Sequence, residues 1–222
     1  AINSYPVIFI FSLIGRSMGG RVAMCYLAKY PTDISACIIE DMDIRRRGVD
    51  SNYIQNFDEA KAIAFKRGHP TLNSLTRELE SIGYPLDIYS KWIDEGRIRE
   101  DTSDGSKHKF WSGVNPAFRA LCYRTIFDSN SGTDSWSKIA TNMQREIDNG
   151  NEADIAKLHL MVAGIGTVCD ESSVEHMRKS IPERTPLSAK TYSEGTHSIH
   201  NSVREEFMAD LKQIINDARN MM

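Results

Sequence analysis

The sequence predicts an α/β protein with a parallel sheet and a helical insertion between the second and third strands. Two observations support this fold class. A strand pattern, a helix pattern and a second strand pattern follow one another within the first 43 residues, and connections of this kind join parallel strands. After a long stretch of helical patterns, two more strand patterns return near the C-terminus, each with a helix after it.

The first three elements form a βαβ unit. Residues 7–14 are a continuous run of β-branched, aromatic and other apolar residues, typical of a strand buried on both faces. Gly15 ends this strand, and a helix is predicted at residues 18–30, where Pro31 stops it. The second strand is predicted at residues 36–39.

The insertion is predicted to be helical and to contain no comparable strand. We therefore assign residues 1–43 and 158–222 to the sheet domain and residues 44–157 to a helical lid. Helices are expected at residues 58–67, 72–82, 86–95, 116–127 and 135–148.

The sheet pattern resumes with a strand at residues 158–163 and ends with a strand at residues 187–192. Between them, a helix is predicted to begin near Ser172, which forms a capping box with Glu175. A terminal amphipathic helix is predicted at residues 203–219, with apolar residues at helical spacing.

Composition restricts the classes of function. The 222 residues carry a formal net charge of −3, so no basic surface for nucleic acid is expected. The four cysteines are far apart and form no CxxC pair, which favours a reducing compartment and argues against a zinc knuckle. The N-terminal apolar run is too short to span a bilayer and lacks the flanks of a signal peptide. We expect a soluble intracellular protein, cytoplasmic or organellar.

A serine flanked by glycines lies between the first strand and the following helix. Residues 15–19 read GRSMG, and a GxSxG sequence between a buried strand and a helix is the context of a nucleophile elbow. The glycines allow a tight turn, and the helix N-terminus, with the Met18 backbone N–H as one donor, would stabilise an oxyanion. The pattern predicts Ser17 as a nucleophile, with an ordinary glycine-rich turn as the alternative.

A serine nucleophile needs a base at the same edge of the sheet. His197 follows the last predicted strand and is the favoured base, whereas His200, three residues later, is its competitor. The His-x-x-His spacing also occurs in metal sites, but no further ligand cluster supports one here. We therefore expect neither a metal nor a cofactor.

The third group needed is an acid that orients the imidazole. Asp41 closes the second strand and is favoured over Asp170, which follows the third strand and is also placed to cap the next helix. Glu40 is expected to point to the opposite side of the strand end from Asp41, and Asp43 is a weaker alternative. With either leading acid, the chain order is serine, acid, histidine, as in α/β-hydrolases.

Four segments resemble a known family. Residues 14–24 resemble the GHSMGG elbow of α/β-hydrolase esterases and, more narrowly, that of the abhydrolase-domain-eleven-like acyl-esterase branch. Residues 38–42 resemble the strand after the elbow in that branch, residues 110–116 its W-x-x-N lid segment, and residues 195–200 its GHWxH histidine loop.

This resemblance implies that the chain is the C-terminal part of an α/β-hydrolase fold. It also implies a serine hydrolase that cleaves a small-molecule carboxylic ester or thioester through an acyl-enzyme, with Ser17, His197 and Asp41 as the triad and no cofactor. In that branch the first histidine of the loop is catalytic and an acid after the later strand is typically absent, which also favours Asp41.

The sequence departs from the family in three ways. Arg16 stands where the family has histidine, and Ser198 stands where it has tryptophan, so both alter the pocket wall. The family also places several strands before the elbow, including the loop that donates a second oxyanion N–H. We expect these strands to be missing from this chain. The chain is then a fragment, or its gene model begins late, or another chain completes the sheet. The isolated chain is then expected to hydrolyse esters poorly or not at all, and the alternative function is an inactive or truncated interaction module.

Overall fold

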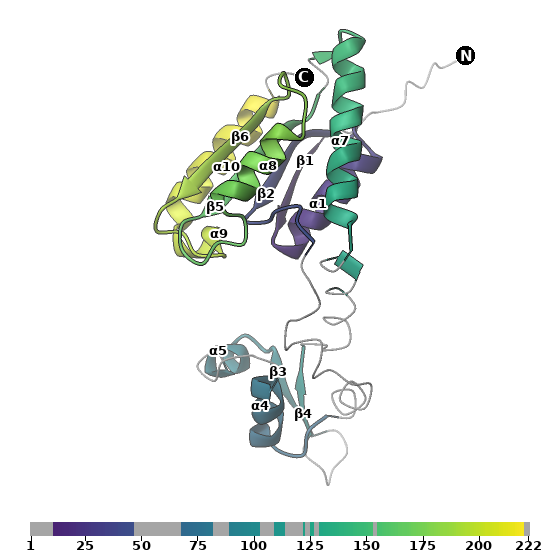
Figure 1. Cartoon of the computed structure of the whole chain (residues 1–222). Helices are drawn as coiled ribbons and strands as arrows, with labels where there is room; N and C mark the ends of the chain where they lie inside the picture. Colours follow the sequence, from purple (N-terminus) through teal and green to yellow (C-terminus); the bar gives the residue numbers. More distant parts are fainter. Residues whose placement is uncertain are drawn as a thin grey trace, which may run out of the picture. The chain divides into compact units, whose positions relative to one another are not determined.

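A computed structural model gives the structure of this chain and shows two compact units (Figure 1). Residues 1–46 and 129–222 belong to the first unit, and residues 47–128 belong to the second. The structure describes residues 11–46, 68–81, 89–102, 109–113, 122, 125–126, 129–152 and 155–219. The predicted helix at residues 58–67 lies outside the described residues, as do most of the helix at residues 116–127 and Asn115 of the W-x-x-N segment.

The first unit contains a four-stranded sheet in the order β1-β2-β5-β6. All three strand pairings are parallel, as the sequence predicts, and the carboxyl ends of the strands therefore lie at one edge. The strands are β1 (Phe11–Arg16), β2 (Ile34–Glu40), β5 (Lys157–Ala163) and β6 (Leu187–Tyr192).

The first strand is less buried than the sequence predicts. Within the described sheet, β1 is an end strand that pairs with β2. Phe11 is 40% exposed and Ile14 is 43% exposed, so the prediction of burial on both faces is wrong for this part of the run. An apolar run indicates a strand with hydrophobic faces, but it does not specify how many strands and helices cover it.

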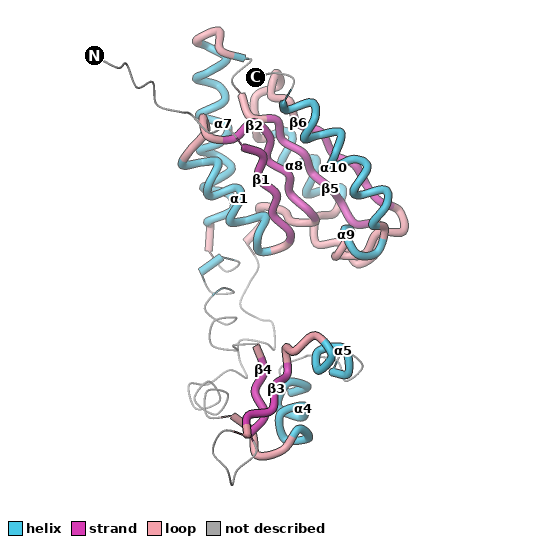
Figure 2. The backbone as a smooth tube through the Cα atoms, turned by 180° about the vertical axis from the view of Figure 1, so that it is seen from behind, coloured by secondary structure: helices cyan, strands magenta, loops and turns pink. Residues whose placement is uncertain are grey.

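Helices cover both faces of the sheet (Figures 1 and 2). Helices α1, α7 and α8 lie on one face, and α9 and α10 lie on the other. The helices are α1 (Met18–Lys29), α7 (Ser131–Asp148), α8 (Glu171–Lys179), α9 (Ile199–Ser202) and α10 (Arg204–Arg219).

Helix α7 belongs to the sheet unit, whereas the predicted boundary at residue 157 places it in the insertion. The structure puts the division after Asp128. The α7 side chain of Trp136 is 1% exposed and donates to the Met177 carbonyl in α8 at 3.0 Å. Asn142 of α7 donates to the Ala28 carbonyl in α1 at 3.2 Å. The apolar face of α7 thus packs in the core of the sheet unit.

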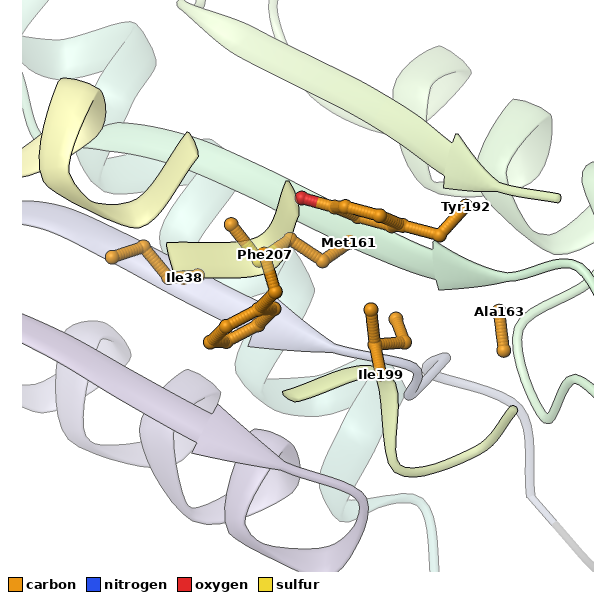
Figure 3. Close-up of a cluster of buried hydrophobic side chains, with 6 residues drawn as sticks. All are labelled: Ile38, Met161, Ala163, Tyr192, Ile199 and Phe207. Carbon is orange, nitrogen blue, oxygen red and sulfur yellow. The ribbon is translucent and has the colours of Figure 1, made fainter. Parts of the chain in front are cut away.

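One face of the sheet carries the hydrophobic cluster shown in Figure 3. Side chains from three strands pack there against α9 and α10, and each large apolar side chain that is fully buried stabilises the fold by roughly 1.5–3 kcal/mol. This cluster holds α9 against the carboxyl ends of the strands. Its buried members are Ile38, Met161, Ala163, Tyr192, Ile199 and Phe207.

The second unit has its own small core. It contains the helices α4 (Leu72–Ser81) and α5 (Tyr89–Asp94), as predicted, and an antiparallel pair of strands, β3 (Ile98–Asp101) and β4 (Lys109–Ser112). The expectation that this region has no strand is therefore wrong, because two strands of four residues are too short to show a clear alternating pattern. The core residues are Leu75, Leu79, Tyr89, Trp92 and Ile98.

Candidate active site

Ser17 lies in a strained turn between β1 and α1. Its backbone has φ 51° and ψ −123°, a region that residues other than glycine rarely adopt and that costs on the order of 1–3 kcal/mol. The Ser17 N–H donates to the Glu40 carbonyl at 2.9 Å, and the Gly20 N–H donates to the Ser17 carbonyl at 2.8 Å. Hydrogen bonds to β2 and to the first turn of α1 therefore hold this conformation in place.

The glycines around Ser17 allow close backbone packing. A Cβ atom on Gly15 would lie 2.2 Å from the Gly19 carbonyl oxygen, and one on Gly20 would lie 2.9 Å from Met42 Cβ. A Cβ on Gly19 would meet nothing within 4 Å. Packing therefore requires glycine at positions 15 and 20, whereas it does not require glycine at position 19.

His197 and Asp41 are in direct contact. The His197 Nδ1 donates to Asp41 Oδ2 at 2.6 Å, and the Asp41 side chain is fully buried while that of His197 is 31% exposed. His197 lies in the loop between β6 and α9, and Asp41 directly follows β2. The Arg16 Nε donates to the His197 carbonyl at 3.2 Å, so the residue before Ser17 lies against the histidine loop.

Asp41 is held as a carboxylate by several donors. Besides His197, the Thr167 hydroxyl donates to Asp41 at 2.6 Å and the Val168 N–H at 3.0 Å. Burial alone raises the pKa of Asp41, but the hydrogen bonds from His197, Thr167, Val168 and Ala163 outweigh it and lower the pKa from 3.8 to about 2. Asp41 is therefore ionised at neutral pH, as an acid that orients a histidine must be.

This low pKa links Asp41 to stability in acid. Since the pKa in the folded protein lies below the usual 3.8, ionised Asp41 stabilises the fold above pH 4, and this contribution, roughly 2 kcal/mol, is lost as the pH falls toward 2. In the Asp41→Asn variant this titration is absent. Urea unfolding at several pH values is expected to show a shallower loss of stability between pH 4 and 2 for the variant. Equal slopes would contradict the assignment.

Asp170 does not contact His197 and instead caps α8. Its side chain accepts from the Ser173 N–H at 2.8 Å and from the Ser172 hydroxyl at 2.7 Å. Hydrogen bonds from Ser173 and Ser172 hold the pKa of Asp170 well below its usual range. The helix begins at Glu171 with Asp170 as its N-cap, so the predicted capping box starting at Ser172 is wrong. The extended backbone of Asp170 points its carboxylate at the free N–H groups of the first turn.

The other acids after β2 also have distinct partners. Asp43 is fully buried and forms ion pairs with Arg21 of α1 and with Arg45, so it belongs to a structural network of charges. Glu40 instead binds His200, whose Nδ1 lies 2.8 Å from Glu40 Oε1. This second histidine–carboxylate contact was not predicted. The only sequence signal for it is the expectation that Glu40 points away from Asp41.

The residues that the structure describes contain no group of three or more His, Cys, Asp or Glu side chains that could hold a metal ion. Within the same part of the chain, no helix combines the length and the apolarity needed to cross a membrane.

Neither a family model nor a curated protein matches this sequence. Solved structures nevertheless resemble it. The peroxisomal alpha-beta-hydrolase Lpx1 from Saccharomyces cerevisiae matches 100% of this chain with a TM-score of 0.56 at 13% identity. This chain has the α/β-hydrolase fold. The predicted fold class is therefore confirmed.

Two further structures share the α/β-hydrolase fold with this chain. An esterase from Exiguobacterium antarcticum matches 92% of the chain with a TM-score of 0.52 at 16% identity. The thioesterase domain from the curacin biosynthetic pathway matches 90% of it with a TM-score of 0.51 at 11% identity. The chain spans 57%, 66% and 65% of the length of Lpx1, the esterase and the thioesterase domain, respectively.

Proposed function

We propose that this chain is a serine hydrolase that cleaves a small-molecule carboxylic ester or thioester, with Ser17, His197 and Asp41 as its triad. The observation that carries the proposal is the 2.6 Å hydrogen bond from His197 to the buried Asp41. It lies after the ends of β6 and β2, at the same sheet edge as the strained turn of Ser17. The likeness to a solved esterase and a thioesterase domain supports the acyl-ester class.

In the first half of the reaction, Ser17 Oγ attacks the carbonyl carbon while His197 Nε2 takes the hydroxyl proton. The carbonyl electrons move to oxygen, and the Met18 N–H at the start of α1 donates to this oxyanion. When the oxyanion collapses, the bond to the alcohol or thiol breaks, and this leaving group takes the proton from His197. Asp41 stays ionised and stabilises the imidazolium.

In the second half, water attacks the acyl-enzyme carbonyl while His197 Nε2 takes a proton from the water. The second oxyanion collapses, the bond to Ser17 Oγ breaks, and Ser17 recovers the proton from His197. The products are a carboxylic acid and the regenerated enzyme. The scheme needs no cofactor.

We assign the inserted residues 47–128 as the predicted lid domain. They follow β2 and precede α7 in the chain, and they have a hydrophobic core separate from that of the sheet unit. We also assign Arg16, which directly precedes Ser17, and Ser198, which directly follows His197, to the wall of the substrate pocket. The resemblance of the elbow and histidine loop supports membership of the abhydrolase-domain-eleven-like branch.

Labelling of Ser17 tests the proposed function. A fluorophosphonate probe is expected to modify Ser17, identified by mass spectrometry of the labelled peptide, and Ser17→Ala is expected to abolish both labelling and hydrolysis of a p-nitrophenyl acyl ester. Ser12→Ala in β1 is the matched control, because the Ser12 hydroxyl is engaged by Ser35, and it is expected to behave like the wild type. If folded wild-type protein is not labelled, the proposed function fails, and the alternative of an inactive interaction module is favoured.

A further inference from the structure

A second histidine–carboxylate pair lies beside the proposed triad. Glu40 is the last residue of β2, and its side chain is 3% exposed. Its Oε1 accepts both the backbone N–H of His200 at 3.1 Å and the His200 Nδ1–H at 2.8 Å. A buried carboxylate needs such partners, because leaving it without them is costly. The pair therefore ties the start of α9 to the end of β2.

Glu40 also contacts the elbow. Its backbone carbonyl accepts the Ser17 N–H at 2.9 Å, while its side chain holds His200. The next residue, Asp41, holds His197. Glu40 and Asp41, the last residue of β2 and the residue after it, thus bind two histidines that are three residues apart at the start of α9. The elbow, the strand end and the histidine loop form one connected set of hydrogen bonds.

Helix α9 depends on such contacts because it contains only four residues. An isolated helix of that length is unstable in water. Ile199 is fully buried in the cluster of Figure 3, and the His200 ring packs edge-on against Phe207 with the ring centroids 6.1 Å apart. The apolar contacts fix the depth of α9, and the hydrogen bonds from His200 to Glu40 fix its position along β2.

We propose that Glu40 and His200 are a positioning pair that sets where His197 presents its Nε2. This proposal rests on the proposed function. Neither residue is assigned a contact with the reacting atoms; the pair acts through residues 197–200. A catalytic group that is misplaced by about 1 Å can lower turnover roughly 100-fold. A pair that holds residues 197–200 in place can therefore affect the rate without touching the substrate.

Three variants test the pair by kinetics. In His200→Ala the side-chain donor to Glu40 is lost while the backbone donor remains, and the second-order rate of Ser17 labelling and kcat are expected to fall about 100-fold with KM little changed. His200→Asn is expected to restore most of the rate, since its amide N–H can reach Glu40. The matched control is His159→Ala, which removes the 2.7 Å contact of His159 with Ser188 between β5 and β6, and it is expected to keep the wild-type rate.

A second measurement does not depend on hydrolysis. The His197 proton shared with Asp41 is expected to give a downfield proton resonance in the wild type, and this resonance is expected to vanish in His200→Ala and return in His200→Asn. If it vanishes while wild-type Ser17 is not labelled, the proposed function fails and the positioning role stands. If His200→Ala keeps the resonance, or keeps the wild-type labelling rate in a labelled protein, the positioning pair is wrong.

Discussion

Asp41→Asn is expected to lower the rate of ester hydrolysis about 10⁴-fold, the loss typical of a triad whose acid becomes an amide. The reason is the tautomer of His197. A carboxylate at Asp41 accepts the Nδ1 proton, which leaves Nε2 free to take the proton of Ser17. An amide at this position donates a proton to Nδ1 instead, so that Nε2 carries the remaining ring proton and no longer serves as a base.

Asp170→Asn is the matched control for this prediction. It makes the same chemical change in the other acid that the sequence offers. Asn caps helix N-termini about as well as Asp, so α8 is expected to keep its start and the hydrolysis rate is expected to stay close to wild type. Steady-state hydrolysis and fluorophosphonate labelling measure both variants. Full activity in Asp41→Asn together with loss of activity in Asp170→Asn would reverse the assignment of the acid.

The effect of Asp41→Asn on folding must be separated from its effect on chemistry. Asp41 also accepts from Thr167 and Val168, so the variant is expected to be less stable at neutral pH. Its backbone φ of 45° is tolerated by asparagine. Rates are therefore compared at a temperature where circular dichroism shows both variants folded. A loss of rate that scales with the unfolded fraction would point to a structural role alone.

The sequence predicted the parallel sheet and placed Asp41 and His197 at its edge because of where strands end. Residues 157–163 and 187–192 form the third and fourth strands of the sheet, close to their predicted bounds. The period of the hydrophobic pattern and the residue composition are local properties, and they locate helices and strands well. Since parallel strands share one carboxyl edge, locating the strands also locates the loops that bring His197 to Asp41.

The sequence did not reveal which partner each polar group finds. The sequence offers His197 and His200 as competing bases but does not show that each pairs with a different carboxylate, His197 with Asp41 and His200 with Glu40. The pairing of His200 depends on how α9 packs in the hydrophobic cluster. The sequence position of Asp170 fits both a triad acid and a helix cap, and in the structure its extended backbone makes it the N-cap of α8. The exposure of Ile14 likewise depends on the neighbours of β1. These outcomes are set by tertiary contacts, which a local pattern does not contain.

Gly15→Ala is expected to destabilise the fold by at least about 3 kcal/mol, more than is usual for one added methyl group. The added Cβ would lie 2.2 Å from the Gly19 carbonyl oxygen and 2.8 Å from the Gly20 nitrogen. Both are backbone atoms in the first turn of α1, so no side-chain rotation relieves the clash. The turn must open, and the hydrogen bond from Gly20 to Ser17 is expected to break.

Gly19→Ala is the matched control in the same motif. A Cβ at this position meets nothing within 4 Å, and alanine is favoured over glycine in a helix by up to about 1 kcal/mol. Urea unfolding is therefore expected to show an unchanged or higher stability for Gly19→Ala and a large loss for Gly15→Ala. Similar stabilities for the two variants would mean that the close approach of Gly15 to Gly19 does not exist in solution.

The same comparison in a Ser17→Ala background separates folding from chemistry within the motif. The clash at Gly15 involves only backbone atoms of Gly19 and Gly20, so its cost is expected to be the same without the serine hydroxyl. Hydrolysis, in contrast, is expected to be absent in that background whatever residue occupies position 15. The fold thus requires Gly15 for its packing, and only the chemistry requires Ser17. A GxSxG sequence therefore indicates a tight strand-to-helix turn first, and a hydrolase only when its serine is joined by a histidine and an acid.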